Sequence, residues 1–191
     1  MGIDPSITAS GVCLLYNDRP PVFKTVGEPS GKPLSKRLWH LQTKLITSLD
    51  QKSNPLLVGI ETPISPLALG KMGGAGFNNN IMAYAMAYEM LGKFRLPYVE
   101  ISTKQRAMIA TGNGSSNKEE VTEAYFHLED ENGYLLIDPE ANHNEIDAYW
   151  LAMGAAEVLA LTGGSFIPFG GWLELTCNTY DMLERLEIQE P

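Results

Sequence analysis

Residues 1–11 read Met-Gly-Ile-Asp-Pro-Ser-Ile-Thr-Ala-Ser-Gly, and they predict how the chain begins its sheet. The apolar residues at 1–4 and 11–16 flank a turn-rich segment, which predicts a β-hairpin. The first strand of this hairpin ends in the carboxylate of Asp4. The second strand carries Cys13 within an apolar run, so we expect a buried thiol there.

Further along the chain, the apolar pattern predicts alternating strands and helices. A short, continuous apolar run ends in Glu61, as in a buried strand. Asn117 is placed to cap the helix that follows it, with Glu120 completing a capping box. The expected strands after the hairpin are 21–26, 56–61 and 97–101, the helices are 34–50, 80–95, 103–111, 118–129 and 144–161, with a short one near 179–187, and 63–80 is expected to be a loop. This order predicts an α/β fold with a mixed sheet and helices on its faces.

The length of 191 residues and the 44% of hydrophobic residues suit one compact domain. We expect this domain to span residues 1–162, with 163–191 as a C-terminal extension of the same domain or an interface. There is no run of ~18 or more apolar residues and no basic-then-apolar leader, so we expect a cytoplasmic protein without a membrane span. Two isolated cysteines predict neither a disulfide framework nor a zinc site.

The net charge of −9 counts against a nucleic-acid partner, because contacts with phosphates usually require a basic face. The acidic residues are concentrated after residue 119, whereas the basic residues fall mainly between 19 and 118. One face of the molecule can therefore still be positive.

Three carboxylates each follow apolar residues that would be buried: Asp4, Glu61 and Asp147. A carboxylate at the edge of a core is costly unless a cation or donor meets it. Several such groups that converge would bind Mg²⁺ or Mn²⁺, and two ions ~3.5–4 Å apart suit phosphodiester cleavage. Taken singly, Asp4 is also typical of a turn, Glu61 of a solvated strand end and Asp147 of a helix N-terminus.

Four motifs resemble those of RuvC-type Holliday-junction resolvases, which are nucleases of the RNase H-like superfamily. Residues 2–11 resemble the opening Gly-Ile-Asp-Pro-Gly motif, and 59–61, Gly-Ile-Glu, resemble the second acidic motif. Residues 112–118 resemble the Gly-x-Gly-x-x-x-Lys loop, and Asp147-Ala148 resembles the last motif. The matches follow the order of the family over residues 2–152.

This resemblance implies an RNase H-like, five-stranded mixed sheet flanked by helices on both faces. It also implies a homodimer that nicks four-way DNA junctions with Mg²⁺, or with Mn²⁺ in its place, through two ions per site. The products would carry a 5′-phosphate and a 3′-hydroxyl. Asp4, Glu61 and Asp147 would bind metal, and Lys118 would lie near the scissile phosphate.

The chain departs from the family where a further acid is usual, three residues before Asp147. Asn144 stands there, and its amide oxygen shares a helix face with Asp147 and is a candidate metal ligand. His143 is the alternative, as a group that orients or deprotonates the attacking water, and Glu145 is the third choice. Residues 163–191 match no motif.

Candidate DNA contacts surround these motifs. Lys104, Arg106 and Lys118 bracket the Gly-x-Gly loop and are candidates for binding phosphates, although surface lysines and arginines are often merely solvated. Phe77, in the glycine-rich segment after Glu61, is a candidate wedge between bases at a branch point. Flexibility alone is the alternative explanation for that segment.

Three other functions stay open. The first is an RNase H-like nuclease acting on a different nucleic acid, since fold does not fix substrate. The second is a branched-DNA-binding protein with impaired catalysis, which Asn144 suggests. The third is an ATPase or sugar-kinase-like domain, because those proteins also open with Gly-Ile-Asp; the short chain and the lack of a second phosphate-binding motif disfavour it.

Overall fold

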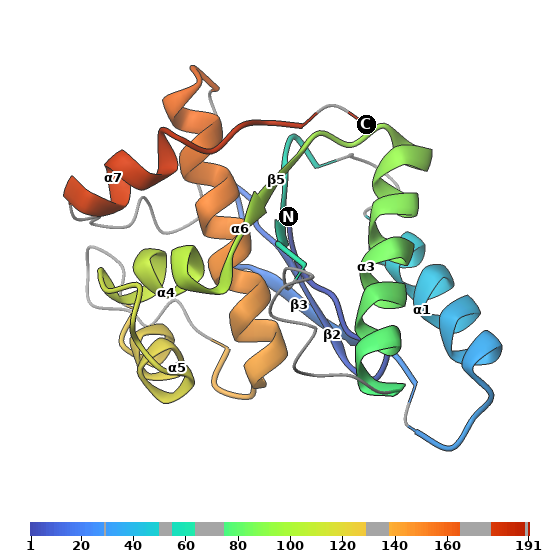
Figure 1. The fold of residues 1–191 in the computed structure, drawn as a ribbon. Helices are drawn as coiled ribbons and strands as arrows, with labels where there is room; N and C mark the ends of the chain where they lie inside the picture. The colour runs from blue at the N-terminus through green and yellow to red at the C-terminus, as the bar shows by residue number, and fades with distance from the viewer. Residues whose placement is uncertain (29, 50–54, 64–74, 129–137, 165–176, 190) are drawn as a thin grey trace.

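A computed structural model describes residues 1–28, 30–49, 55–63, 75–128, 138–164, 177–189 and 191 (Figure 1). For residues 75–78, 177, 178 and 180 it describes the backbone alone.

The centre of the molecule is a five-stranded sheet in the order β3-β2-β1-β4-β5. Its strands are β1 Gly2–Asp4, β2 Ser10–Leu14, β3 Val22–Val26, β4 Val58–Glu61 and β5 Tyr98–Ile101. The two hairpin pairings, β1 with β2 and β2 with β3, are antiparallel, whereas β1–β4 and β4–β5 are parallel. The mixed sheet predicted from the sequence is confirmed.

The helices also follow the predicted order. They are α1 Leu34–Ser48, α3 Ala75–Phe94, α4 Thr103–Thr111, α5 Lys118–Phe126, α6 His143–Leu161 and α7 Cys177–Leu183. The expected loop over 63–80 is wrong at its end, because α3 already begins at Ala75. The poor helix formers Gly76 and Asn78 favour a loop only weakly, and tertiary structure overrides such propensities.

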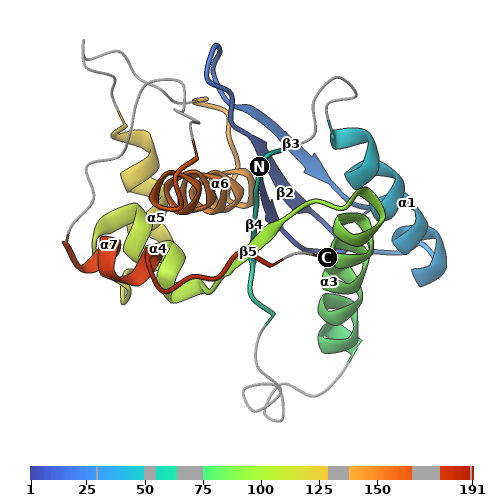
Figure 2. The same ribbon diagram turned by 90° about the horizontal axis from the view of Figure 1, so that it is seen from above.

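Helices cover both faces of the sheet, as predicted. Figure 2 shows α1 and α3 on one side, and α6 with α4, α5 and α7 on the other. The strands supply both cores by alternation: Ile3, Val12 and Ile60 point to the α1–α3 side, whereas Cys13 and Val99 point to the α6 side. Cys13 is fully buried, as expected.

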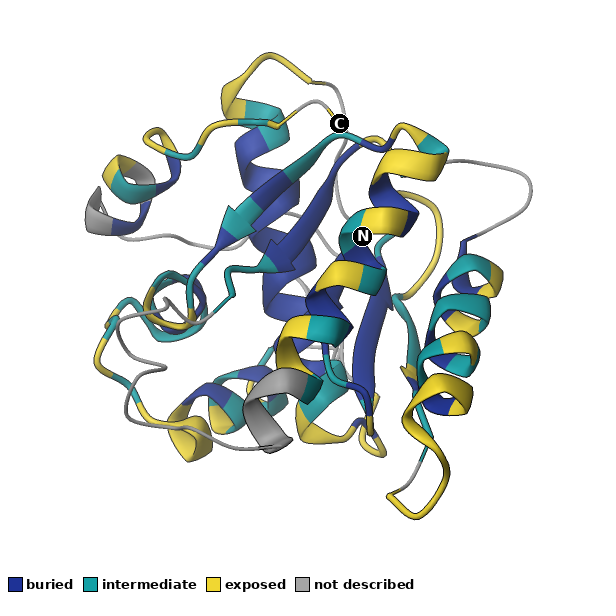
Figure 3. Ribbon diagram, turned by 45° about the vertical axis from the view of Figure 1, so that its right-hand side comes forward, coloured by how far each residue is buried: buried dark blue, intermediate teal, exposed yellow. Residues whose placement is uncertain are grey.

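Helix α6 lies directly against the backbone of three neighbouring strands. A Cβ added at Gly2 would be 1.9 Å from the carbonyl oxygen of Ala148, and one at Gly59 would be 2.1 Å from that of Leu151. Any side chain on these glycines would therefore push the helix off the sheet. The helix is buried along most of its length, and Figure 3 shows it in dark blue behind the strands.

The starts of α5 and α6 are fixed by capping boxes. Asn117 and Glu120 form the predicted box at α5, and Asn142 and Glu145 form one at α6. These caps set the first turn of each helix, and the first turns carry several of the candidate site residues.

The end of the chain returns to the sheet. Tyr98 and Gln189 exchange two backbone hydrogen bonds, of 3.0 and 2.7 Å, so the C-terminal segment bridges to the outer edge of β5. The division at residue 162 stays a prediction. Within the described ranges, none of the helices has the length and apolar character needed to cross a membrane.

Candidate active site

Asp4 and Glu61 lie side by side at one edge of the sheet. Asp4 ends β1 and Glu61 ends β4, and the two strands are parallel with Ile3 opposite Ile60. The next residue on each strand is therefore a carboxylate, on strands about 4.8 Å apart.

Helix α6 brings Asp147 to the same place. Arg106, from α4, joins this carboxylate to that of Glu61: its Nη1 lies 3.0 Å from Oε1 of Glu61 and 3.2 Å from Oδ2 of Asp147. Lys118, at the start of α5, places its Nζ 3.8 Å from Oδ2 of Asp147. Carboxylates from β1, β4 and α6 thus meet basic groups from α4 and α5.

Two hydroxyl groups orient Glu61. Tyr84 of α3 donates a hydrogen bond of 3.1 Å to Oε2, and Thr103 of α4 donates one of 3.0 Å to Oε1. Neither role was predicted from the sequence. The spacing of Thr103 and Arg106 is a usable signal, because residues three apart on a helix share a face and α4 starts directly after β5.

The burial of these acids makes their negative charge costly. Desolvation, together with the charges of Glu61 and Asp147, raises the pKa of Asp4 to about 8. Desolvation also raises the pKa of Asp147, although Arg106 and Lys118 oppose it. A site of this kind gains from a further cation, and its all-oxygen donors fit Mg²⁺ or Mn²⁺.

These carboxylates do not surround a common point where an ion could sit. Within the described ranges, no three acid, imidazole or thiol side chains form a ready metal-binding group. The guanidinium of Arg106 stands between Glu61 and Asp147, which explains why these carboxylates converge on a nitrogen and not on a common empty point.

The fold has known counterparts. No protein-family model matches the sequence, and no curated protein sequence matches it significantly. Two solved structures of RuvC from Thermus thermophilus are similar, each with a TM-score of 0.60. One, a complex with a Holliday junction substrate, is 18% identical over 79% of this chain and 88% of that chain. The other is 17% identical over 88% of this chain and 98% of that chain. The chain has the RuvC fold.

The RuvC-like loop at 112–118 connects α4 to α5. Gly112 ends α4 in the left-handed conformation, with φ 73°, and the loop leads to the capped start of α5. This geometry delivers Lys118 to Asp147. The match of the third RuvC motif in the sequence therefore corresponds to a segment at the site.

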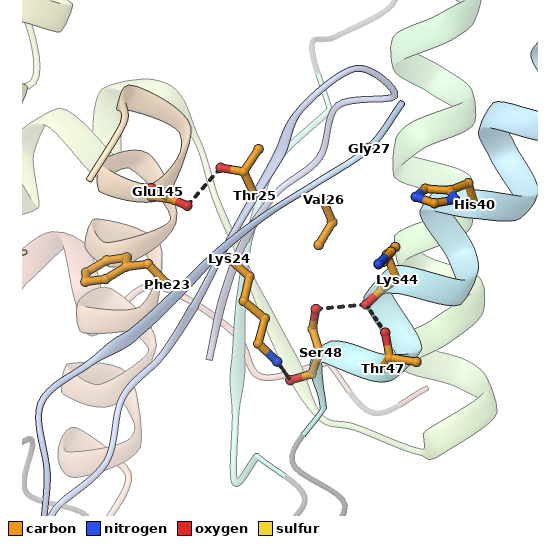
Figure 4. A pocket seen from close by; sticks show the side chains of 10 residues that line it. All are labelled: Phe23, Lys24, Thr25, Val26, Gly27, His40, Lys44, Thr47, Ser48 and Glu145. Atoms are coloured by element: carbon orange, nitrogen blue, oxygen red, sulfur yellow. Dashed lines mark hydrogen bonds between the residues drawn. The ribbon is translucent and has the colours of Figure 1, made fainter. Parts of the chain in front are cut away.

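The three candidates for the missing RuvC acid occupy different places. Asn144 is half-buried one turn before Asp147, and exposed His143 contacts Oγ1 of Thr122 through Nδ1 at 3.0 Å. Glu145 accepts from Oγ1 of Thr25 at 2.9 Å, and so lines a separate hollow of about 640 Å³ between β3 and α1 (Figure 4). The geometry thus favours Asn144 and His143 over Glu145.

The four DNA-binding candidates also differ. Lys104 is exposed on α4 and Lys118 is half-exposed. Arg106 is not the surface residue that the sequence predicts: it is buried against carboxylates, because its helix faces the acidic edge of the sheet. A contact between Arg106 and DNA stays a prediction. The side chain of Phe77, and residues 64–74 before it, lie outside what the structure describes.

Proposed function

We propose that this chain is a metal-dependent endonuclease that cuts branched DNA, with the four-way Holliday junction as its substrate. The observation that carries the proposal is the meeting of Asp4, Glu61 and Asp147 at one buried edge of a RuvC fold. Burial and mutual repulsion make the negative charges of this cluster costly unless cations offset them.

Asp4, Glu61 and Asp147 would hold Mg²⁺ or Mn²⁺, with the amide oxygen of Asn144 as a further ligand. When bound, the metal supplies activation of water and stabilisation of the leaving oxygen in phosphodiester hydrolysis. Two ions per site would act together, and the products would be a 5′-phosphate and a 3′-hydroxyl.

Side chains around the carboxylates have further proposed roles. Tyr84 and Thr103 fix the carboxylate of Glu61 by hydrogen bonds to its two oxygens, which sets the direction of its lone pairs. Lys118 projects its ammonium from the start of α5 toward the cluster and is half-exposed, so it can meet a DNA phosphate there. His143, one turn before Asp147, is exposed and contacts Thr122, and it is the candidate group for orienting the attacking water.

Symmetry and the similar solved structures support a four-way junction as the substrate and a dimer as the assembly. The Thermus protein was solved with a Holliday junction substrate, and a four-way junction has two equivalent strands to cut. A homodimer would present two such sites related by a two-fold axis. Local lysines, and not the net charge of −9, would then provide the DNA-binding surface.

Cleavage of a synthetic four-way junction tests this proposal, with a linear duplex of the same sequence as the control. In Mg²⁺ or Mn²⁺, we expect paired nicks in the junction and little cleavage of the duplex. Equal cleavage of both would indicate a nuclease with another substrate. No cleavage of either, and no binding, would refute the proposal.

A second candidate is a junction-binding protein with impaired catalysis, which Asn144 in the place of an acid favours. Binding measured in Ca²⁺ separates the two functions, because it does not require turnover. Tight and selective junction binding in Ca²⁺, without nicks in Mg²⁺ or Mn²⁺, would establish the second candidate.

A further inference from the structure

We propose that Arg106 is an internal cation that competes with divalent metal for Glu61 and Asp147, so that metal loading requires its guanidinium to move. This inference rests on the metal site of the proposed function and adds a control of loading to it. It assigns to Arg106 a role different from the DNA contact that the sequence suggests.

One nitrogen atom of Arg106 contacts two of the proposed metal ligands. Nη1 of Arg106 contacts carboxylate oxygens of both Glu61 and Asp147, at 3.0 and 3.2 Å. A divalent ion that bridged these two residues would need the same oxygens. Guanidinium and metal therefore exclude each other there, by both space and charge.

Burial makes this competition strong. The side chains of Arg106, Glu61 and Asp147 are 10%, 16% and 7% exposed, so water screens their charges poorly. Lys118 also lies near Asp147 but is 53% exposed, and it can swing into solvent at little cost. Of the two basic groups, Arg106 is the one held in place.

The hydrogen bonding of Arg106 is incomplete at one atom, which makes its guanidinium easier to displace. Its Nε is buried and, within the described residues, has no hydrogen-bond partner. A buried donor without a partner is costly, and a displaced guanidinium would recover a partner in water or on an anion. The guanidinium of Arg106 thus occupies the metal-free site, but an incoming metal ion can still displace it.

Charge balance supports the same conclusion. Three carboxylates would carry up to three negative charges in the metal-free site, and Arg106 and Lys118 return two positive ones. The metal-free site therefore already holds basic groups that offset most of this negative charge.

Calorimetric titration of the full chain with Mn²⁺, without DNA, tests the proposal through affinity and not through activity. Arg106→Gln removes a cation that contacts two of the proposed ligands. The variant should therefore bind Mn²⁺ more tightly than wild type, by about tenfold or more. Arg106→Lys keeps the charge and should stay closer to wild type. Lys93→Gln is the control: it removes the same charge from an exposed position at the far end of α3 and should bind as wild type does.

Nuclear magnetic resonance of the wild-type chain gives a second readout that does not depend on the folding of a variant. The Nε–Hε signal of Arg106 should move as Mg²⁺ is added and should saturate together with metal binding. An unmoved signal at saturating Mg²⁺ would overturn the inference, as would equal Mn²⁺ affinities for the wild type and Arg106→Gln.

These failures differ from failure of the proposed function. If wild type and Arg106→Gln both bind Mn²⁺ with the same affinity, the metal site stands and Arg106 does not compete for it. If neither the wild type nor any of these variants binds Mn²⁺ or Mg²⁺, the proposed metal site itself is wrong, and the inference falls with it.

Discussion

Gly11 lies so close to Asn144 that a Cβ on the glycine would be 1.7 Å from the carbonyl oxygen of the asparagine. This approach holds the first turn of α6 against β2, one turn before Asp147. Gly11→Ala should therefore displace the start of α6, lower the free energy of unfolding by about 1–3 kcal/mol and reduce cleavage. Chemical denaturation and a junction assay measure the two effects.

Gly92→Ala is the matched control for this substitution. Nothing lies within 4 Å of a Cβ added at Gly92, which is in α3. Alanine is the better helix former there, so stability should stay the same or rise by about 1 kcal/mol. A Gly11→Ala protein as stable and active as wild type would show that α6 tolerates a shift.

Tyr84→Phe tests the orientation of Glu61. The variant loses only the hydroxyl that donates to Oε2, and loss of such a supporting group typically costs about 10–100-fold in metal affinity or activity. Tyr88→Phe is the control, because Tyr88, one turn later on α3, donates to Glu100 and not to Glu61. If the two variants behave alike in Mn²⁺ titrations, Tyr84 does not support the site.

The sequence predicts much of this fold because its signals are local. Short, largely apolar segments mark the strands, and the cap at Asn117 with its capping box was predicted and is present. The carboxylates could also be found in advance, since Asp4 and Glu61 end buried parallel strands. Parallel strands ending together bring such residues to one edge of the sheet.

The partners of these acids could not be found in the same way. Arg106 looks like a solvated helix residue in the sequence, and only the docking of α4 beside the sheet turns it toward Glu61 and Asp147. Tyr84 sits in a helix rich in Ala and Met whose apolar pattern indicates core packing. Its hydroxyl donates a hydrogen bond to Glu61, which is distant in the chain, so local residue spacing cannot reveal this contact.

Stability without metal should depend on the ionisation of Asp4. Its pKa is raised from 3.8 to about 8 in the folded chain, so between these pH values the folded state binds more protons than the unfolded state. The free energy of unfolding should therefore fall as pH rises from about 5 to 8. Thermal unfolding in EDTA measures this slope.

Asp4→Asn provides the comparison for the pH experiment, because the amide does not titrate. Its slope over the same range should be flatter than that of wild type. Parallel slopes for the two proteins would mean that Asp4 titrates alike in the folded and unfolded chains.

Lys118→Ala tests the basic group that borders the cluster. Its ammonium lies 3.8 Å from Asp147 and is half-exposed, so removing it should lower turnover, weaken junction binding, or do both, by up to about tenfold in each. Lys36→Ala, on the exposed surface of α1, removes the same charge on the other side of the sheet. If the Lys118→Ala and Lys36→Ala proteins have the same cleavage rate and junction affinity, Lys118 has no role at the site.

The most direct test of the metal-dependent nuclease site compares Asp4→Asn with wild type on one four-way junction, measuring nicking in Mg²⁺ and binding in Ca²⁺. The proposed role of the carboxylate at the end of β1 is to hold the metal that cleavage needs, whereas the proposed junction contacts come from basic side chains. Nicking should therefore be abolished while junction affinity stays largely intact. Cleavage at the wild-type rate by Asp4→Asn would contradict the account.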